Sequence, residues 1–305
     1  MSNKIILRLS NNIGNQMFMY AAAYSFAKQL NRELYIDEES SFNSKNKIHK
    51  YELDSFNFTS KIAPVNYKFL YLKGNLKRKL LKKINSFKRT KNFYIEHRNH
   101  QKITFYNNDF LKDNYSQKLF IEGHFESEKY FSNFKKDINN EFTFKFKDLY
   151  IKNELFKLIN NSNSVSICLR QNRFSEKFRK ISYFDKKKSE TFALEQIKYI
   201  KKSIDILKTK LQNPKFFIWT NDSTNLEEHF PKNQFTIINN NQSGLDLFLM
   251  TQAKHYIVIP SSFNWWGCWL SNHTNKIVFR PSNNFFSEFK LNNRDFWPDS
   301  WKVID

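Results

Sequence analysis

Arginine and serine side chains at two places in the chain have the chemistry of an anion-binding site. Arg170 directly follows the apolar run SVSICL (164–169), and Ser261 and Ser262 precede an apolar, Trp-rich segment that begins at Phe263. A guanidinium presents a planar fork of donors that matches phosphate oxygens, and the N–H groups at a helix start favour anions. Together these residues are suited to hold a diphosphate. The alternatives are a surface salt bridge for Arg170 and a plain helix cap for the serines.

Asp222 is a third polar residue at the end of an apolar run, because TND (220–222) closes KFFIWT (215–220). Its carboxylate can accept two hydrogen bonds from a guanine edge, or it can cap the helix that follows. Signatures of other chemistries are absent: the chain has no G-x-x-x-x-G-K-[ST], no G-x-G-x-x-G, no H-E-x-x-H and no D-x-D. Cys168 and Cys268 are far apart and form no C-x-x-C. We therefore expect no metal, no cofactor and no disulfide framework.

The elements that position these residues alternate between strand and helix. We expect strands at 4–9, 33–37, 164–169, 215–220, 235–238, 256–259 and 276–279, and helices at 16–30, 195–211, 245–253 and 263–270. Repeated β–α units favour parallel sheets with helices on both faces. The two alternating blocks predict two α/β domains that face each other across a cleft, with a boundary near 145–163, because the turn-rich NSNS (161–164) precedes the second block.

Four polar segments fall at the carboxyl ends of predicted strands: SNNIGNQ (10–16), RQNR (170–173), TND (220–222) and PSS (260–262). Ligands of open parallel sheets bind at these ends. By itself this convergence indicates only a ligand-binding α/β protein.

The composition is strongly basic, with 50 Lys and Arg against 29 Asp and Glu and a formal net charge of +21. Such a charge suggests a polyanionic partner, although a general bias of the chain toward Lys, Asn, Ile and Phe explains most of it. No run of about 18 apolar residues occurs, so we expect no membrane-spanning helix. The apolar part of the start is too short for a secretory signal, and we expect a cytoplasmic protein.

One segment concentrates the charge. Residues 66–91 contain ten Lys and Arg and no Asp or Glu, while apolar residues recur at helical spacing. Basic amphipathic helices of this kind can lie on anionic membrane surfaces. The alternative is a solvated helix whose apolar row packs on its own domain.

Five segments, taken in order, resemble the bacterial alpha-1,2-fucosyltransferases of glycosyltransferase family 11. IGNQMFMYAAAYSFAKQL is similar to the family's G-x-G-N-Q-M-F-x-Y opening, and GHFESEKYF (123–131) to its G-Y-[WF]-Q-S-E-K-Y-F. SVSICLRQNR stands where V-H-x-R-R-G-D belongs, and FIWTND matches I-F-[ST]-[DN]-D. The long segment DLFLMTQAKHYIVIPSSFNWWGCWL is similar to D-L-x-L-M-S-x-C-x-x-x-I-x-x-[NP]-S-[ST]-F-S-W-W-x-A-x-L.

The resemblance implies a GT-B-like pair of Rossmann-type domains: residues 1–155 on the acceptor side and residues 156–305 for the GDP-sugar. It implies metal-independent, inverting transfer of fucose from GDP-beta-L-fucose to the 2-hydroxyl of a galactose. The acceptor would be a surface glycan, and a lipid-linked acceptor would give residues 66–91 a role at the cytoplasmic face of the inner membrane. Carried onto this chain, Arg170 should bind the β-phosphate and act in catalysis, Asp222 should face the guanine, and Ser261, Ser262 and Phe263 should border the diphosphate.

Other positions complete the implied site. Asn15 should lie near the reacting fucose and acceptor, with Gln16 beside it, and His124 and Glu126 are candidates for the general base. Gly14 is expected to make the tight turn between strand and helix.

The segment SVSICLRQNR also departs from the family motif V-H-x-R-R-G-D. Cys168 replaces the family His, Gln171 replaces the second Arg, and Asn172 and Arg173 replace Gly-Asp. Arg173 adds a positive charge near the expected diphosphate. A related transferase with another donor or acceptor is therefore an alternative. A basic nucleic-acid-binding protein is a weaker one, because the Trp cluster lies in an uncharged segment away from the lysines.

Overall fold

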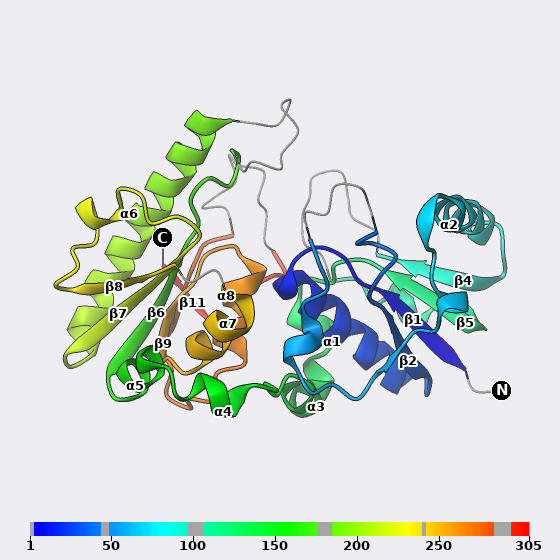
Figure 1. Ribbon diagram of the computed structural model, residues 1–305, viewed down its shortest axis with the longest axis horizontal. Coiled ribbons are helices and arrows are strands. Elements are labelled where there is room, and N and C mark those ends of the chain that lie inside the picture. Colours follow the sequence, from blue (N-terminus) through cyan, green and yellow to red (C-terminus); the bar gives the residue numbers. More distant parts are fainter. Residues whose placement is uncertain are drawn as a thin grey trace. The chain divides into compact units, whose positions relative to one another are not determined.

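The computed structural model describes residues 3–43, 49–96, 106–175, 185–239, 242–283 and 294–304 (Figure 1). The chain forms two compact units. Unit 1 consists of Met1–Lys145 with Arg294–Phe296, and unit 2 consists of Phe146–Asn293 with Trp297–Asp305. Each unit is built on one parallel sheet, which confirms the predicted fold class of two α/β units.

Unit 1 contains a five-stranded sheet with the order β3-β2-β1-β5-β4, in which every neighbouring pair is parallel. Its strands and helices are β1 (Lys4–Arg8), α1 (Ile13–Gln29), β2 (Glu33–Asp37), β3 (Lys61–Ile62), α2 (Tyr71–Asn85), β4 (Thr90–Ile95), β5 (Asn114–Glu122) and α3 (Lys135–Glu141). The central strand β1 is apolar and buried along its middle. Helix α1 is apolar around most of its circumference, so it is buried along nearly its whole length.

Unit 2 contains a six-stranded parallel sheet with the order β11-β10-β9-β6-β7-β8. Its strands and helices are α4 (Lys147–Tyr150), α5 (Glu154–Asn160), β6 (Asn163–Leu169), α6 (Lys186–Lys210), β7 (Pro214–Thr220), β8 (Phe235–Ile238), α7 (Ser243–Thr251), β9 (His255–Ile257), α8 (Ser262–Trp269), β10 (Val278–Pro281) and β11 (Lys302–Ile304). The core lies between the sheet and α6, where β6, β7 and β9 meet the apolar face of the helix.

Helices α7 and α8 of unit 2 pack closely on each other. A Cβ atom built on Gly267 of α8 would clash with the side chain of Met250 in α7. The glycine in the Trp-rich segment therefore leaves room for the Met250 side chain between the two helices.

The structure corrects the prediction for Gly14. This glycine lies inside the first turn of α1, is buried, and does not have a positive φ. The left-handed residue between β1 and α1 is Asn11, with φ of 64°, because asparagine tolerates this region better than most residues. Gly14 is thus a helix residue, and the turn belongs to Asn11.

Two further expectations concern helices. The helix predicted at 195–211 is present but begins earlier, at Lys186, where the Asp185 side chain accepts a hydrogen bond from the Lys188 N–H. Across the described ranges, no helix combines the length and the apolar character needed to cross a bilayer.

Candidate functional site

The carboxyl edge of the unit 2 sheet gathers three of the polar segments. Strand β6 lies between β9 and β7. All three strands are parallel, so the segments that follow them leave the sheet at the same edge. Arg170 follows β6, Asp222 follows β7, and Ser261 follows β9. The strand order thus groups residues that are up to 91 positions apart in the sequence, counting from Arg170 to Ser261.

The backbone of Arg170 is held by a buried glutamine of α6. The Arg170 N–H donates to Gln196 Oε1 at 3.1 Å, and Gln196 Nε2 donates to the Arg170 carbonyl at 3.0 Å. The same amide group also donates to the Phe192 carbonyl within α6. Gln196 is completely buried, so this clamp fixes where Arg170 leaves the sheet.

The loops after β6 and β7 are joined by side-chain amides. Asn221 and Gln171 exchange two hydrogen bonds, and Gln171 Nε2 donates to the Asp222 carbonyl at 2.7 Å. Asn172 Nδ2 donates to Asp222 Oδ2 at 2.6 Å. Asn172 has φ of 54°, which asparagine tolerates. Two of the three residues that depart from the motif after Arg170 therefore act as a brace between neighbouring loops.

Both carboxylate oxygens of Asp222 have partners in these loops. Oδ1 accepts hydrogen bonds from the Thr224 N–H at 2.9 Å and from the Thr224 hydroxyl at 2.6 Å. These bonds from Thr224, together with the one from Asn172, hold the pKa of Asp222 below its usual range. Asp222 thus stays ionised and organises its own loop, and its contact with a guanine stays a prediction.

Cys168 and Arg173 lie at opposite sides of Arg170 in the sequence and differ in environment. Cys168 lies in β6 and packs against the apolar core, and burial raises the pKa of its thiol to about 12. It is therefore a neutral thiol at physiological pH and cannot supply the charge of a protonated histidine. The Arg173 guanidinium lies 5.6 Å from the centre of the Phe192 ring, as a cation–π contact.

The amino end of α8 follows β9 and carries the predicted diphosphate contacts. Ser261 is the N-cap residue, with extended backbone, but its hydroxyl makes no capping hydrogen bond. Ser262 and Phe263 form the first turn and are half-buried. Asn264 is 3% exposed, and within the described part of the chain neither polar atom of its amide has a hydrogen-bond partner. A buried amide of this kind is unusual in a folded protein, where most buried polar groups are hydrogen-bonded.

Unit 1 brings together the predicted acceptor-side residues Asn15, His124 and Glu126. Asn15 Nδ2 donates to Glu126 Oε1 at 2.7 Å and lies 3.3 Å from His124 Nδ1. Asn11 Nδ2 lies at the same distance from His124 Nδ1. A carboxylate and an imidazole held side by side are the group types used as general bases, so this cluster can accept a proton from a hydroxyl.

The loop that carries His124 and Glu126 is held by Glu96, which follows β4. The Glu96 carboxylate accepts the N–H of His124 at 2.7 Å and the N–H of Phe125 at 3.1 Å. Phe125 is completely buried and has φ of 52°, a conformation that costs a bulky residue energy. A Cβ on Gly123 would lie 2.5 Å from the Glu96 Cβ. Close approach therefore explains the glycine of GHFESEKYF.

Gln16 is completely buried in unit 1, and its amide bonds the chain's own backbone. Its Nε2 donates to the carbonyls of Asn11 and Lys50, each at 2.7 Å, and its Oε1 accepts the Glu52 N–H at 3.0 Å. Gln16 thus ties the turn before α1 to the segment at 50–52. Its predicted role toward an acceptor stays a prediction.

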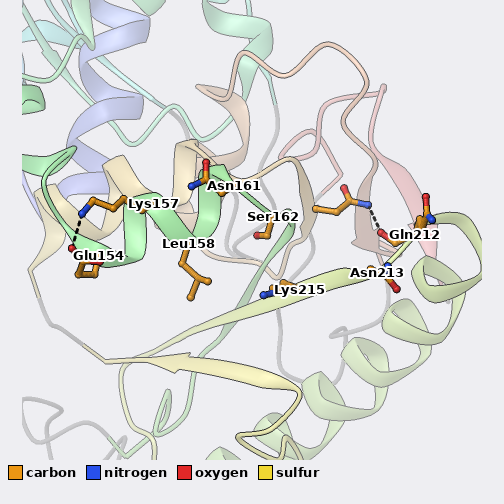
Figure 2. Close-up of a pocket in the computed structure, with 9 residues that line it drawn as sticks. Glu154, Lys157, Leu158, Asn161, Ser162, Gln212, Asn213 and Lys215 are labelled. Carbon is orange, nitrogen blue, oxygen red and sulfur yellow. Dashed lines mark hydrogen bonds and ion pairs between the residues drawn. The ribbon is translucent and has the colours of Figure 1, made fainter.

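A surface hollow of about 650 Å³ lies at the other edge of the unit 2 sheet (Figure 2). It is lined by Glu154, Lys157, Leu158, Asn161, Ser162, Asn163, Gln212, Asn213 and Lys215. These residues surround the amino ends of β6 and β7, whereas Arg170 and Asp222 follow the carboxyl ends. The hollow is therefore separate from the predicted donor site. Among the described residues, no group of three or more His, Cys, Asp or Glu is placed to hold a metal ion.

The sequence profile of glycosyl transferase family 11 matches residues 2–305. The chain belongs to glycosyl transferase family 11. It is thus a glycosyltransferase, and the family resemblance expected from its five segments is confirmed.

Two curated relatives match along their full lengths. An alpha-1,2-colitosyltransferase of Escherichia coli is 27% identical over 99% of this chain and 99% of its own. The O-antigen biosynthesis glycosyltransferase WbnK of Escherichia coli is 27% identical over 96% of this chain and 98% of its own.

Solved structures share the fold. NodZ alpha-1,6-fucosyltransferase from Bradyrhizobium, soaked with GDP-fucose, has a TM-score of 0.53 at 14% identity and covers 88% of this chain and 93% of its own. A variant of Arabidopsis thaliana FUT1 in complex with GDP has a TM-score of 0.55 at 11% identity and covers 98% of this chain and 75% of its own. The GT-B-like architecture expected from the resemblance is confirmed.

Gln196, Glu96 and Asn264 are residues of these sites that the sequence did not single out. A signal for Gln196 was available, since it is a polar residue four positions from Phe192 and from Ile200 on the buried face of α6. Glu96 carries no such signal, because its role depends on a loop distant in the sequence.

Proposed function

We propose that this chain is an inverting galactoside alpha-1,2-fucosyltransferase. It moves L-fucose from GDP-beta-L-fucose to the 2-hydroxyl of a galactose in a surface glycan. The observation that carries the proposal is the carboxyl edge of the unit 2 sheet, where Arg170, Asp222 and the start of α8 leave adjacent parallel strands in a chain that belongs to family 11 along its whole length.

The donor diphosphate is assigned to Arg170 and the first turn of α8. The guanidinium is permanently charged and matches two phosphate oxygens at once. Helix-start N–H groups add positive potential, and the Asn264 amide is a buried donor at the same helix end. Because Cys168 is neutral, Arg170 and Arg173 are the charged groups of this motif in unit 2.

The transfer is a displacement at C1 of the sugar. The acceptor oxygen forms a bond to C1 while the bond from C1 to the β-phosphate oxygen breaks, and the electron pair leaves on GDP. The phosphate gains negative charge in the transition state, so a fixed guanidinium stabilises the transition state more than the ground state. Arg170 is suited to this because Gln196 immobilises its backbone.

The proton of the acceptor hydroxyl is assigned to Glu126. Asn15 holds this carboxylate at 2.7 Å, and His124 lies beside the same amide. Asn15 therefore orients the base, and the hydroxyl loses its proton as the new bond forms.

Colitose is the second candidate for the transferred sugar. Colitose is fucose without its 3-hydroxyl, and an alpha-1,2-colitosyltransferase is a full-length relative of this chain. The relative that acts in O-antigen biosynthesis supports a cell-surface glycan as acceptor for either sugar.

The test is transfer to a set of galactosides with GDP-fucose, GDP-colitose, GDP-mannose and UDP-galactose as donors, together with the thermal shift that each donor produces. We expect a GDP-deoxysugar to be used and the UDP-sugar to be rejected. Product analysis by NMR should show an α-1,2 linkage. A preference for GDP-colitose would select the second candidate, and a linkage to another hydroxyl would contradict the proposal.

Replacement of Arg170 tests the donor site. Arg170→Ala should lower kcat by roughly 100- to 1000-fold, as the loss of one donor to a developing anion does, and should weaken the thermal shift by GDP. Arg89→Ala removes an exposed arginine outside both sites and is the matched control. An Arg170→Ala enzyme that kept most of its rate would overturn the assignment.

A further inference from the structure

Helix α2 exposes its apolar row in place of burying it. Leu72, Leu76, Leu80 and Ile84 repeat every four residues and so lie along one side of the helix. They are 75%, 57%, 59% and 40% exposed, and α2 contains no buried residue. A surface helix of a globular protein normally turns such a row toward the core.

The opposite side of α2 holds the helix to unit 1, and it does so through polar groups. Arg78 donates to both carboxylate oxygens of Glu122 at 2.5 and 2.7 Å, and Lys82 Nζ lies 2.8 Å from Glu122 Oε2. The Asn85 side chain bonds the backbone of Asn92 and Phe93.

At about 100° per residue, these anchoring residues point away from the apolar row. The anchored side faces β4 and β5, where α2 lies beside the edge of the sheet (Figure 1). The apolar row therefore does not face unit 1. It lies on the outward side of α2, whose other side is held to unit 1 by ion pairs and hydrogen bonds.

Exposed lysines border the apolar row. Lys79 and Lys83 lie on one side of the row, and Lys73 and Lys77 lie on the other. None of these four forms an ion pair with another described residue. Phe87, just beyond the end of α2, is 85% exposed, and Tyr71 at its start is 70% exposed. Aromatic residues at both ends and lysines along both flanks are typical of a helix that lies in the headgroup region of a bilayer.

We propose that α2 docks unit 1 on an anionic lipid bilayer. The row Leu72–Leu76–Leu80–Ile84 enters the acyl boundary, and the four bordering lysines meet acidic headgroups. Charge complementarity selects this partner: residues 66–91 contain ten Lys and Arg and no acidic residue. Three of the ten, Lys68, Arg78 and Lys82, pair with glutamates of unit 1. The proposal does not depend on which sugar the enzyme transfers.

The experiment is sedimentation of the full chain with lipid vesicles. Vesicles of equal parts phosphatidylcholine and phosphatidylglycerol are compared with vesicles of phosphatidylcholine alone. We expect binding to the anionic vesicles only, and weaker binding at high salt, because salt screens the lysines. Equal partition into both vesicle types would contradict the charge contribution, and wild-type protein that stays in the supernatant would overturn the proposal.

Two variants separate the apolar and the charged contributions. The double variant Leu76→Ser/Leu80→Ser shortens the apolar row, and the double variant Lys77→Gln/Lys83→Gln removes two charges. Each should weaken binding at least tenfold. For the lysine variant, one lysine near an anionic surface contributes roughly a fivefold factor, so the loss of two exceeds tenfold. Matched controls are Leu149→Ser with Leu194→Ser and Lys187→Gln with Lys201→Gln, which change exposed residues of unit 2. All variants should keep the wild-type circular dichroism spectrum and the wild-type rate on a water-soluble acceptor.

Binding that the α2 variants leave unchanged would show that another surface contacts the lipid, and would overturn the proposal. Binding of the wild type to polyuridylate but not to vesicles would also overturn it and would favour a nucleic-acid partner. Neither vesicle sedimentation nor polyuridylate binding depends on sugar transfer, so the proposed function is tested independently.

Discussion

At the residue scale, Glu126 combines the two properties that a general base needs. It is a carboxylate in the loop that follows β5, and a neighbouring amide fixes its position at 2.7 Å. The neighbouring His124 has the same chemical capacity, but its backbone is held by Glu96 and its ring contacts two asparagine amides. We therefore favour the carboxylate as the base.

Replacement of Glu126 distinguishes the base from its neighbours. Glu126→Gln keeps the shape and the contact with Asn15 but cannot take a proton, so kcat should fall by about 100- to 10,000-fold. The KM for the donor should change little, because the donor is assigned to unit 2. The readout is kcat against pH with saturating donor. If Glu126→Gln kept the wild-type rate and His124→Gln lost it, His124 would be the base.

At the element scale, α6 positions Arg170 through Gln196. Gln196→Leu keeps the volume of the side chain but leaves the N–H and the carbonyl of Arg170 without this partner. Unfolding should become easier by about 1–3 kcal/mol, and kcat should fall while the thermal shift by GDP decreases. Urea unfolding measures the stability, steady-state kinetics measure kcat, and thermal denaturation with and without GDP measures the shift.

Ile200→Val is the matched control, because it alters the same buried face of α6 without touching Arg170. It should cost about 1 kcal/mol of stability and leave kcat unchanged. If the two variants lost activity in proportion to lost stability, Gln196 would be a structural residue only.

The attachment of α2 to the rest of unit 1 through Glu122 should depend on pH. Burial opposes the ionisation of Glu122, but the hydrogen bonds from Arg78 and Lys82 outweigh it and hold the pKa of Glu122 below its usual range. A lowered carboxyl pKa stabilises the folded state above the unfolded value of about 4.3, and this contribution is lost as the pH falls through the folded pKa.

Glu122→Gln should therefore cost about 1–3 kcal/mol at neutral pH, and this difference from the wild type should shrink below about pH 4. Urea unfolding of both proteins from pH 3 to pH 7 measures it, and the exposed Glu154→Gln is the control with almost no expected effect. A difference that stayed constant with pH would show that the charge of Glu122 does not hold the helix.

At the scale of the whole molecule, the nucleotide and the lipid surface are assigned to different units. Hydrogen exchange should separate them. GDP should slow exchange in the segments after β6 and β7 and in the first turn of α8, and leave α2 unchanged. Anionic vesicles should slow exchange in α2 and leave those three segments unchanged. Protection of α2 by GDP in the absence of lipid would contradict this division.

The fold class could be predicted because local periodicity reports it. Apolar runs such as 4–9 and 164–169 became the central strands β1 and β6, and the polar residue after each run necessarily lies at a strand end. The motif at 123–131 was also visible as a sequence, but the reason for its glycine was not, since Gly123 is required by the approach of Glu96 from β4.

Sequence by itself determined the alternation of strands and helices, the two parallel sheets, the family and the basic, apolar character of 66–91. Those features depend on residue types and on neighbours within a turn or two. Only the tertiary structure decided which contacts they serve. Asn15 meets Glu126 across 111 positions, Gln196 reaches Arg170 across 26, and Glu122 reaches Arg78 across 44. Such pairs are set by how strands order in a sheet and which side of a helix docks, and no local pattern records that choice.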